Sequence, residues 1–352
     1  MRNIVFTGGG SGGHVMPAIT LIKKLKCDSK WKISYIGGRN SIERSLISEY
    51  EVPYKPIFTG KLRRYFSLEN FIDLFKVALG FLQSLLHFIK MPSNTIVFAT
   101  GGFVCVPVVI AAKLTGKRVF IHEQTSRVGL ANKICSKFSD TIFVSFEESI
   151  PFFPMERVEL SGYPLRDECY TDEISTREFQ GFSLNGEKPL IFLTGGGNGS
   201  LLLNNLLRND LDDLKKKFRI IHQVGKAFIE EYSEFKTADY LPVAFVGKEM
   251  IDIMKAADIV ISRSGAGTVC ELMALKKKSV YIPLKIAQKN EQYHNAMEAH
   301  RKLGSIVIEE DQLKGMSIFD VLESMNDLDK EIENYDIMNG ADFILTKINQ
   351  SL

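Results

Sequence analysis

Two glycine-rich turns in the sequence carry the side chains best suited to chemistry. One is DIVISRSGAGTVCE at residues 258–271, where an apolar run ends at glycines and a helix-like pattern begins at Thr268. This order predicts a buried parallel strand, a turn and a helix start. A helix start suits a phosphate, and Glu271 could accept hydrogen bonds from sugar hydroxyls. The alternative is a capped turn in which Glu271 only favours the helix dipole, and the segment alone leaves both open.

The other turn is RNIVFTGGGSGGH at residues 2–14, which ends at His14. A single histidine is commonly structural, but one presented by a flexible, phosphate-friendly loop could take part in the chemistry. The glycines fit GxGxxG, so a dinucleotide-binding domain has to be considered. In such a domain the second strand ends near an acidic residue. Here it ends in GGRN at residues 37–40, which argues against a nicotinamide cofactor.

Alternating strands and helices would position these turns. Strand-like runs between residues 95 and 144 alternate with helix-like stretches, which predicts a parallel sheet with helices on both faces. Ligands of such sheets bind beyond the carboxyl ends of the strands, so the loop at 100–103 should lie at the same edge as His14. His122 and Glu123 also follow a strand there. They could form a structural hydrogen-bonded pair, or one of them could share in the chemistry.

The second half of the chain repeats the opening pattern. SGYPLR at residues 161–166 has the glycine and proline of a connector, and a charged, irregular stretch follows it. A strand and TGGG then recur at 189–197, about 190 residues after the first, which argues for two similar Rossmann-like halves. A polar segment at 285–295 could contact sugar hydroxyls or be a solvated loop. The residues after 326 predict a closing helix or two that could pack back on the first half.

Composition restricts the class of protein. At 352 residues two domains are expected, and 45% hydrophobic with 24% charged residues is an ordinary globular balance. A net charge of +2 does not suggest a nucleic-acid partner. Five scattered cysteines predict reduced thiols, neither a disulfide framework nor a zinc site. We expect a cytosolic protein with no signal peptide and no transmembrane helix.

Residues 55–90 differ from the rest of the chain in charge and aromatic content. Six basic residues there oppose only Glu69 and Asp73, an excess of four positive charges, and apolar residues recur at helical spacing from Phe71. An aromatic, basic amphipathic segment suits an anionic membrane surface. A core helix beside a solvated basic loop is the alternative. The residues expected at the membrane are Lys61, Arg63, Arg64, Phe71, Phe75 and Phe81.

The order and spacing of several motifs resemble those of one enzyme family over nearly the whole chain. The motifs are GGGSGGHVMPA, ATGGFVCVP, IHEQTSRVGLANK, SGYPLR, TGGGNGSLLLN, SRSGAGTVCEL and EQYHNA. On these residues the chain is similar to the MurG family, the lipid-linked N-acetylglucosaminyltransferases of peptidoglycan synthesis. That family transfers GlcNAc from UDP-GlcNAc to the undecaprenyl-diphosphate-linked muramyl pentapeptide (lipid I) and so forms lipid II.

The resemblance implies a GT-B fold, an α/β architecture in which two Rossmann-like domains present parallel sheets to a deep cleft. Residues 1–163 would form an acceptor- and membrane-binding domain, with a C-terminal helix at about 335–352 packing back on it. Residues 164–334 would bind UDP-GlcNAc. The protein would be peripheral, at the cytoplasmic face of the plasma (inner) membrane. Its further partners would be anionic phospholipids and other cell-wall synthesis proteins.

The resemblance also assigns the donor site. Glu271 would contact ribose hydroxyls, Gln292 and its neighbour Asn295 the GlcNAc, and the segment around Val246 the uracil. The residues implied for UDP-GlcNAc binding are Ser11, Gly12, Gly13, Thr125, Arg166, Gly197, Asn198, Val246, Ala266, Gly267, Thr268, Val269, Cys270, Glu271 and Gln292.

The implied reaction is an inverting transfer, in which the 4-hydroxyl of the acceptor attacks the anomeric carbon while UDP leaves. His14 is the first candidate for the base that takes the hydroxyl proton, and Glu123 is the second. Helix N-termini and Arg166 would stabilise the diphosphate charge. No P-loop lysine, GxSxG, HExxH or acidic metal pair follows a strand, so we expect no metal and no cofactor.

Three positions depart from the family pattern, and three other functions stay open. Thr125 stands where the family has asparagine, Gly197 replaces a serine, and Glu291 stands where an amide or histidine is usual. Ser200 or Asn198 could compensate for Gly197. The nearest alternative is a related glycosyltransferase that acts on another lipid such as diacylglycerol. A UDP-GlcNAc epimerase-like hydrolase and a membrane-docked binding protein without catalysis are the others.

Overall fold

The structure is a computed structural model that describes residues 1–60, 69–324 and 338–351, with the backbone alone for 69–72 and Gln288. The chain divides into two compact units, Met1–Leu165 with Met338–Leu352, and Arg166–Ile337. The division falls inside the connector SGYPLR. Within the described ranges, no helix has the length and apolar character that crossing a membrane requires.

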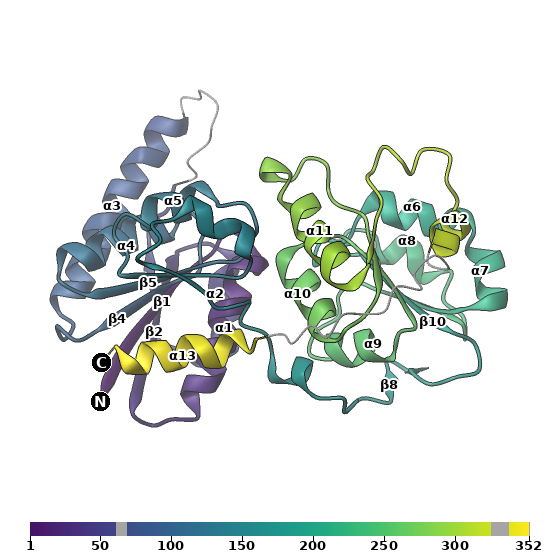
Figure 1. Cartoon of the computed structure of the whole chain (residues 1–352), viewed down its shortest axis with the longest axis horizontal. Coiled ribbons are helices and arrows are strands. Elements are labelled where there is room, and N and C mark those ends of the chain that lie inside the picture. Colours follow the sequence, from purple (N-terminus) through teal and green to yellow (C-terminus); the bar gives the residue numbers. More distant parts are fainter. Residues whose placement is uncertain (61–68, 325–337, 352) are drawn as a thin grey trace. The chain divides into compact units, whose positions relative to one another are not determined.

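The first unit is built on a parallel sheet of seven strands in the order β3-β2-β1-β4-β5-β6-β7 (Figure 1). The strands are β1 (Arg2–Thr7), β2 (Trp31–Gly38), β3 (Tyr54–Ile57), β4 (Ile96–Ala99), β5 (Arg118–Glu123), β6 (Thr141–Val144) and β7 (Val158–Leu160). The helices are α1 (Gly12–Lys26), α2 (Ile42–Ser48), α3 (Glu69–Ile89), α4 (Cys105–Leu114), α5 (Leu130–Cys135), the 3-10 helix η1 (Glu147–Phe152) and α13 (Gly340–Gln350). Thr7 pairs with both Ile36 and Ala99, so β1, β2 and β4 end at one edge.

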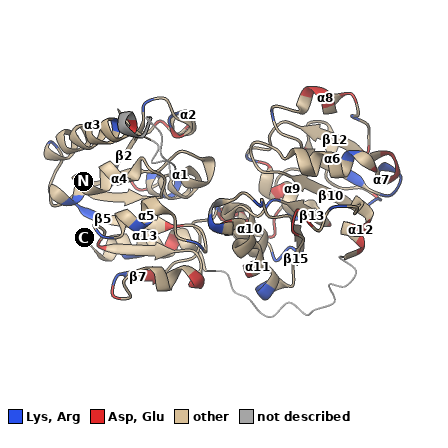
Figure 2. Cartoon of the chain, turned by 90° about the horizontal axis from the view of Figure 1, so that it is seen from above, with Lys and Arg blue, Asp and Glu red and all other residues tan. Residues whose placement is uncertain are grey.

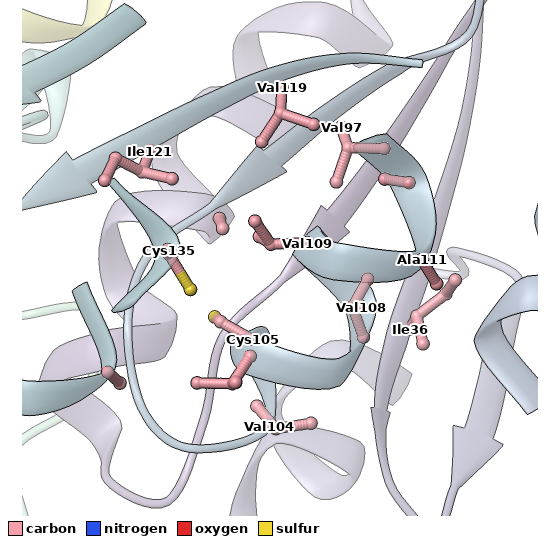
Figure 3. Close-up of a cluster of buried hydrophobic side chains, with 14 of the residues drawn as sticks. Ile36, Val97, Val104, Cys105, Val108, Val109, Ala111, Val119, Ile121 and Cys135 are labelled. Carbon is pink, nitrogen blue, oxygen red and sulfur yellow. The ribbon is translucent and has the colours of Figure 1, made fainter. Parts of the chain in front are cut away.

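Apolar side chains cover both faces of this sheet. Ile4 and Phe6 enter one core cluster with α1 and the apolar residues of α13, whereas Val5 enters the opposite cluster with α4 and α5. This alternation follows from the pleat of a strand, and burial on both faces explains why the strands read as continuous apolar runs. Figure 3 shows the second cluster, in which the thiols of Cys105 and Cys135 point toward one another. Both cysteines are free, as are the other three.

The second unit repeats this plan with a parallel sheet of six strands in the order β12-β11-β10-β13-β14-β15. The strands are β10 (Leu190–Thr194), β11 (Arg219–Gln223), β12 (Tyr240–Val243), β13 (Ile259–Ser262), β14 (Ser279–Tyr281) and β15 (Ile306–Val307). The helices are α6 (Leu201–Asn209), α7 (Leu211–Lys217), α8 (Ile229–Ser233), α9 (Met250–Ala256), α10 (Ala266–Ala274), α11 (Glu291–Leu303) and α12 (Ile318–Glu323). Before the sheet come the 3-10 helix η2 (Asp167–Tyr170) and a hairpin of β8 (Glu178–Phe179) and β9 (Phe182–Ser183), and η3 (Gln288–Asn290) precedes α11.

In each sheet the order of the strands changes direction next to the first strand of the sheet. This point lies between β1 and β4 in the first unit and between β10 and β13 in the second. Open parallel sheets bind ligands at such a point, beyond the carboxyl ends of the two strands. The predicted α/β fold with two Rossmann-like halves is confirmed. The glycine turns of the sequence leave the sheets after β1, β10 and β13, so each starts at one of these points.

Helix α3 has one face in the core and one exposed. Phe88 is fully buried, and Phe81 and Leu85 pack against the cluster of α4 and α5. Phe81, predicted at the membrane surface, is therefore partly buried on the face of α3 that packs against the core. Most of α3 is tan in Figure 2, the colour of residues other than Lys, Arg, Asp and Glu. Among the side chains of α3 that the structure describes, the large apolar ones that are exposed are Leu74, Phe75, Leu79, Leu82, Leu86 and Ile89. Lys61, Arg63, Arg64 and the side chain of Phe71 lie outside the described residues.

Candidate active site

The first glycine turn, residues 8–13, joins β1 to α1 and packs backbone to backbone on the loop after β4. A Cβ atom on Gly102 would lie 2.0 Å from the carbonyl oxygen of Gly9. Gly10 has φ +84°, a left-handed conformation that costs glycine little. Glycine is therefore needed at these positions to bring the turn against the loop.

His14 lies in the first turn of α1 and is held from several sides. Its Nδ1 lies 2.9 Å from Oγ of Ser11, and the hydroxyl of Thr100 donates to its carbonyl oxygen at 2.5 Å. A Cβ atom on Gly101 would lie 3.0 Å from its Cδ2, so the ring packs against that backbone. Burial lowers the pKa of His14 below 6.5, while a backbone contact and the charge of Glu43 partly oppose this. The imidazole is therefore neutral at pH 7 and able to accept a proton.

The start of α1 also contains the predicted donor residues Ser11, Gly12 and Gly13. The Ser11 side chain makes no cap hydrogen bond to the helix, because its hydroxyl faces His14. Beneath the turn lies Glu43, which no sequence motif indicates. Its carboxylate accepts from the backbone N–H of Gly10 at 3.2 Å and of Gly38 at 2.9 Å. One local signal does point to Glu43. It is an acid in the first turn of a helix, and that helix follows a strand that ends in Gly-Gly.

Glu123 organises the loop that follows β5. Its carboxylate accepts from the backbone N–H of Thr125 at 3.1 Å and of Gly129 at 3.2 Å, and from Nδ2 of Asn132 at 3.0 Å. The hydroxyl of Thr125 lies 2.9 Å from the same carboxylate. Burial raises the pKa of Glu123, and these hydrogen bonds counteract the shift. The geometry thus gives Glu123 and Thr125 a shared structural role, and Glu123 has little capacity left to take a substrate proton.

The hydrogen-bonded pair considered for His122 and Glu123 does not form. Neighbouring residues of a strand point to opposite faces, and Nε2 of His122 lies 3.3 Å from the carbonyl oxygen of Gly162 and 3.2 Å from Oγ of Ser145. Burial lowers the pKa of His122 to about 4, so this histidine is neutral and structural.

In the second unit, the turn after β13 ends in an open helix start. Gly265 is the N-cap of α10 and provides no side-chain cap, and the N–H groups of 266–268 have no hydrogen-bond partner within the described chain. These groups can bind an anion. Val269 and Cys270, predicted at the donor, have buried side chains, so only their main chain could reach a ligand. Burial raises the pKa of the Cys270 thiol well above its usual range, which makes it inert.

The predicted donor residues Arg166 and Glu271 form an ion pair. Nη2 and Nε of Arg166 donate to Oε1 of Glu271 at 2.7 Å and 3.2 Å. Both side chains are mostly buried. Oε2 of Glu271 has no hydrogen bond to any described residue, so this oxygen is available to a ribose hydroxyl. The structure therefore brings together two residues that lie far apart in the sequence.

Arg263 supports the turn after β10, and no sequence motif indicates this role either. Its Nη2 and Nε donate to Oγ of Ser200 at 3.0 Å and 3.2 Å, and its Nη1 donates to the carbonyl oxygen of Ile282 at 3.0 Å. It also pairs with Glu310 at 2.7 Å. The guanidinium thus ties the ends of β10, β13 and β14 together. The N–H groups of the exposed Gly197 and Asn198, above it, have no partner among the described residues.

The remaining predicted donor residues also make contacts within the second unit. Oε1 of Gln292 accepts from the N–H of Leu284 at 3.0 Å, which leaves its amide NH2 group for a sugar. Nδ2 of Asn295 donates to the carbonyl oxygen of Ser264 at 3.2 Å. Val246 is buried and Phe245 is exposed, so Phe245 is the side chain able to stack on a base. In the described ranges, no group of three or more His, Cys, Asp and Glu side chains could hold a metal ion.

Sequence models of known families match both units. The glycosyltransferase family 28 N-terminal domain matches residues 4–144, and the family 28 C-terminal domain matches residues 190–347. With two Rossmann-like units that each carry a glycine turn at the switch point, the fold and the site define a GT-B glycosyltransferase.

Individual relatives narrow this class. The chain is 40% identical to the UDP-N-acetylglucosamine–N-acetylmuramyl-(pentapeptide) pyrophosphoryl-undecaprenol N-acetylglucosamine transferase of Clostridium tetani, covering 99% of this chain and 98% of the relative. It is 38% identical to the protein of the same name from Clostridium perfringens, with the same coverage. The crystal structure of Acinetobacter baumannii MurG has the same fold, with a TM-score of 0.72 at 20% identity, covering 99% of this chain and 100% of that one. The chain belongs to the MurG family of N-acetylglucosamine transferases.

Proposed function

We propose that this chain transfers GlcNAc from UDP-GlcNAc to the muramyl pentapeptide carried on undecaprenyl diphosphate, which forms lipid II. The observation that carries the proposal is the 40% identity, over 99% of the chain, to a relative named for that transfer. The first unit would bind the acceptor beside His14. The second unit would bind the donor, because the open helix start of α10 and the free oxygen of Glu271 lie there.

The reaction inverts the anomeric carbon in one displacement. The 4-hydroxyl of the acceptor attacks C1 of GlcNAc, the bond between C1 and the diphosphate oxygen breaks, and its electron pair leaves with UDP. Nε2 of His14 accepts the hydroxyl proton. This requires the tautomer in which Nδ1–H donates to Oγ of Ser11. Glu123 takes no part in proton transfer, because donors already surround its carboxylate.

Backbone groups would stabilise the diphosphate as its charge develops. The N–H groups at the start of α10 and those of Gly197 and Asn198 have no partner among the described residues, so they can bind the diphosphate without reorganisation when its charge forms. Ser200 does not freely replace the missing hydroxyl at Gly197, because it is buried and holds Arg263. Exposed Asn198 is the better candidate for that compensation.

The exposed apolar face of α3 would rest on an anionic membrane surface. Its six large apolar side chains, at residues 74–89, form a stripe on one side of an amphipathic helix. The basic residues predicted beside it, Lys61, Arg63 and Arg64, would add attraction to acidic headgroups. The protein would then be peripheral, at the cytoplasmic face of the plasma (inner) membrane, where lipid I is presented.

The deciding experiment is transfer of radiolabelled GlcNAc from UDP-GlcNAc to a lipid I analogue, with and without vesicles. We expect labelled lipid in both cases and faster transfer with vesicles. Label in diacylglycerol instead would favour the alternative acceptor, and UDP release without any lipid would favour an epimerase-like hydrolase. Absence of transfer under both conditions would refute the proposal.

Membrane docking has its own test. Replacing Leu79 and Leu86 with glutamate should release the protein from anionic vesicles in a flotation assay. Met155, an exposed apolar residue of the same unit outside α3, provides the control, and Met155→Glu should leave binding unchanged. Charge reversal at Lys61, Arg63 and Arg64 should weaken binding in a salt-dependent way. Unchanged binding in the α3 variant would exclude this face.

A further inference from the structure

Glu43 is a buried acid beneath the first glycine turn. It is 1% exposed, and no Lys or Arg of the described chain forms an ion pair with it. Its Oε1 accepts from the N–H of Gly38 at 2.9 Å, and its Oε2 from the N–H of Gly10 at 3.2 Å. Gly38 ends β2, and Gly10 follows β1, so one side chain joins the carboxyl ends of two neighbouring strands.

The turn is shaped around this carboxylate. A Cβ atom on Gly9 would lie 2.3 Å from the carboxylate carbon of Glu43, and one on Gly38 would lie 3.1 Å from Oε1. The start of α2, where Glu43 stands, favours a negative charge. Burying a carboxylate without a cation is nevertheless costly, and a neutral side chain could also link two strands. The charge itself therefore calls for an explanation.

A short chain of contacts leads from Glu43 to the imidazole. Gly10, held by Glu43 in its left-handed conformation, directly precedes Ser11. Oγ of Ser11 lies 2.9 Å from Nδ1 of His14, and the N–H of His14 donates to the carbonyl oxygen of Ser11 at 3.2 Å. Thr100 holds the carbonyl of His14 from the other side. The place of Ser11, and with it the orientation of the ring, depends on the hydrogen bond from Gly10 to Glu43.

We propose that Glu43 is a positioning residue for the transfer reaction, an inference that rests on the proposed function. It holds Gly10 so that Ser11 fixes Nδ1 of His14, and its charge favours the imidazolium that forms in the reaction. In that step the proton of the acceptor hydroxyl passes to Nε2 as the O–C1 bond forms. The C1–O bond to the diphosphate breaks, and UDP leaves with the electron pair.

The test is Glu43→Gln, which removes the charge and places an NH2 group opposite a backbone N–H. We expect kcat to fall about tenfold, a part of what a general base contributes, with the donor KM changed by less than about twofold. We also expect the acid limb of kcat/KM to move to lower pH. The negative charge of Glu43 raises the pKa of His14, so its removal keeps the imidazole neutral to lower pH.

Asp252→Asn is the matched control. Asp252 is a buried acid of the second unit that likewise accepts two backbone hydrogen bonds, from Ser175 at 3.3 Å and from Thr176 at 2.8 Å. Its replacement should lower the free energy of unfolding in a similar way. It should leave kcat and the position of the acid limb unchanged.

Two further variants separate geometry from charge. Glu43→Asp keeps the charge but is too short to reach both N–H groups, so kcat should fall while the acid limb stays near that of the parent protein. Glu43→Gln combined with His14→Ala should be no slower than His14→Ala alone, because both act through one group.

Several results would overturn the inference. One is Glu43→Gln with reduced stability but an unchanged kcat and acid limb. If that variant does not fold, an unchanged kcat in Glu43→Asp would be equally decisive. An additive loss in the double variant would also contradict it. Failure of the unmodified protein to transfer GlcNAc would instead refute the proposed function and is distinguishable from all three.

Discussion

The two glycine turns that follow β1 and β10 share the sequence TGGG but differ in what lies beneath them. In the first unit, Gly10 is left-handed and donates to the carboxylate of Glu43. In the second, Gly196 is left-handed, and its N–H donates to the hydroxyl of Thr194 at 3.1 Å. A carboxylate supports one turn, and the guanidinium of Arg263 supports the other.

The serines that begin the next helices differ in the same way. Ser11 turns its hydroxyl to His14, whereas Ser200 caps α6 through the N–H of Leu203 and receives Arg263. A negative charge beneath the first turn opposes anion binding there and favours a protonated histidine. Beneath the second turn the charge of Arg263 is balanced by Glu310, and the N–H groups of Gly197 and Asn198, which have no partner among the described residues, can bind a diphosphate. Under the proposed function, one local sequence pattern would thus serve proton transfer in one unit and anion binding in the other.

The largest effect is expected from His14→Ala, which tests whether the first turn provides the group that accepts the proton. As the general base, His14 should contribute about 10²–10⁴-fold to kcat, and its loss should leave the donor KM nearly unchanged. Steady-state kinetics with UDP-GlcNAc and a lipid I analogue give both constants. Near-normal turnover would remove His14 from the mechanism and leave the first turn without a chemical role.

A second test concerns a property that the two units should share, the neutral state of a buried core histidine. Burial lowers the pKa of His122 in the first unit to about 4 and of His222 in the second unit to about 3. In the unfolded state both histidines have a pKa near 6.5, so as the pH falls they bind protons there at a higher pH than in the folded protein. The free energy of unfolding is therefore highest above about pH 6.5 and decreases at lower pH. Between pH 6.5 and 5 each histidine should cost about 2 kcal/mol of folding free energy.

Urea unfolding at pH 7.5 and pH 5 measures this loss. His222→Gln removes one of the two groups, so its stability should depend less steeply on pH than that of the parent protein. An equal pH dependence in both proteins would contradict the assignment of His222 as a neutral core residue.

A third test concerns the cation beneath the second turn. Arg263→Lys keeps the charge but loses the planar fork that holds Ser200, so the donor KM should rise about tenfold while kcat at saturating donor changes little. The control is Arg219→Lys. Arg219 donates to the carbonyl oxygens of Lys188, Ser183 and Leu184, at the start of β11 and at the opposite end of the sheet. An equal effect of both substitutions would mean that Arg263 acts through stability alone.

The smallest expected effect is that of Gly101→Ala. Gly101 has φ +97°, and an added Cβ would lie 3.0 Å from the ring of His14, so kcat should fall severalfold in addition to the cost of strained backbone. Gly116→Ala provides the control, because Gly116 has φ +71° but no neighbour within 4 Å of an added Cβ. Equal kcat values in the two variants would show that the ring does not depend on this contact.

Local sequence pattern was sufficient for much of the fold around the candidate site. A strand, a glycine turn and a helix start lie within a few consecutive residues, so the sequence predicts the paired Rossmann-like halves and places His14 and Glu271 just after strand ends. Arg166 was assigned to the donor site by resemblance, but its ion pair with Glu271 spans 105 positions and could not be foreseen. The apolar stripe of α3 was also visible. Helical spacing alone does not say which of two apolar faces packs inward, and Phe81, predicted at the membrane surface, is partly buried against the core.

The positions of Glu43 and Arg263 beneath the turns could not be predicted from local sequence pattern. Glu43 meets Gly10 across 33 positions, and Arg263 meets Ser200 across 63. Adjacent parallel strands bring these groups together, and no local spacing encodes such a pairing. The amino-acid pattern therefore decides where the glycine turns and helix starts stand, because backbone preferences act between near neighbours. The tertiary structure alone decides which charged side chains lie beneath each turn, Glu43 under the first and Arg263 with Glu310 under the second, because these groups come from segments far apart in the sequence.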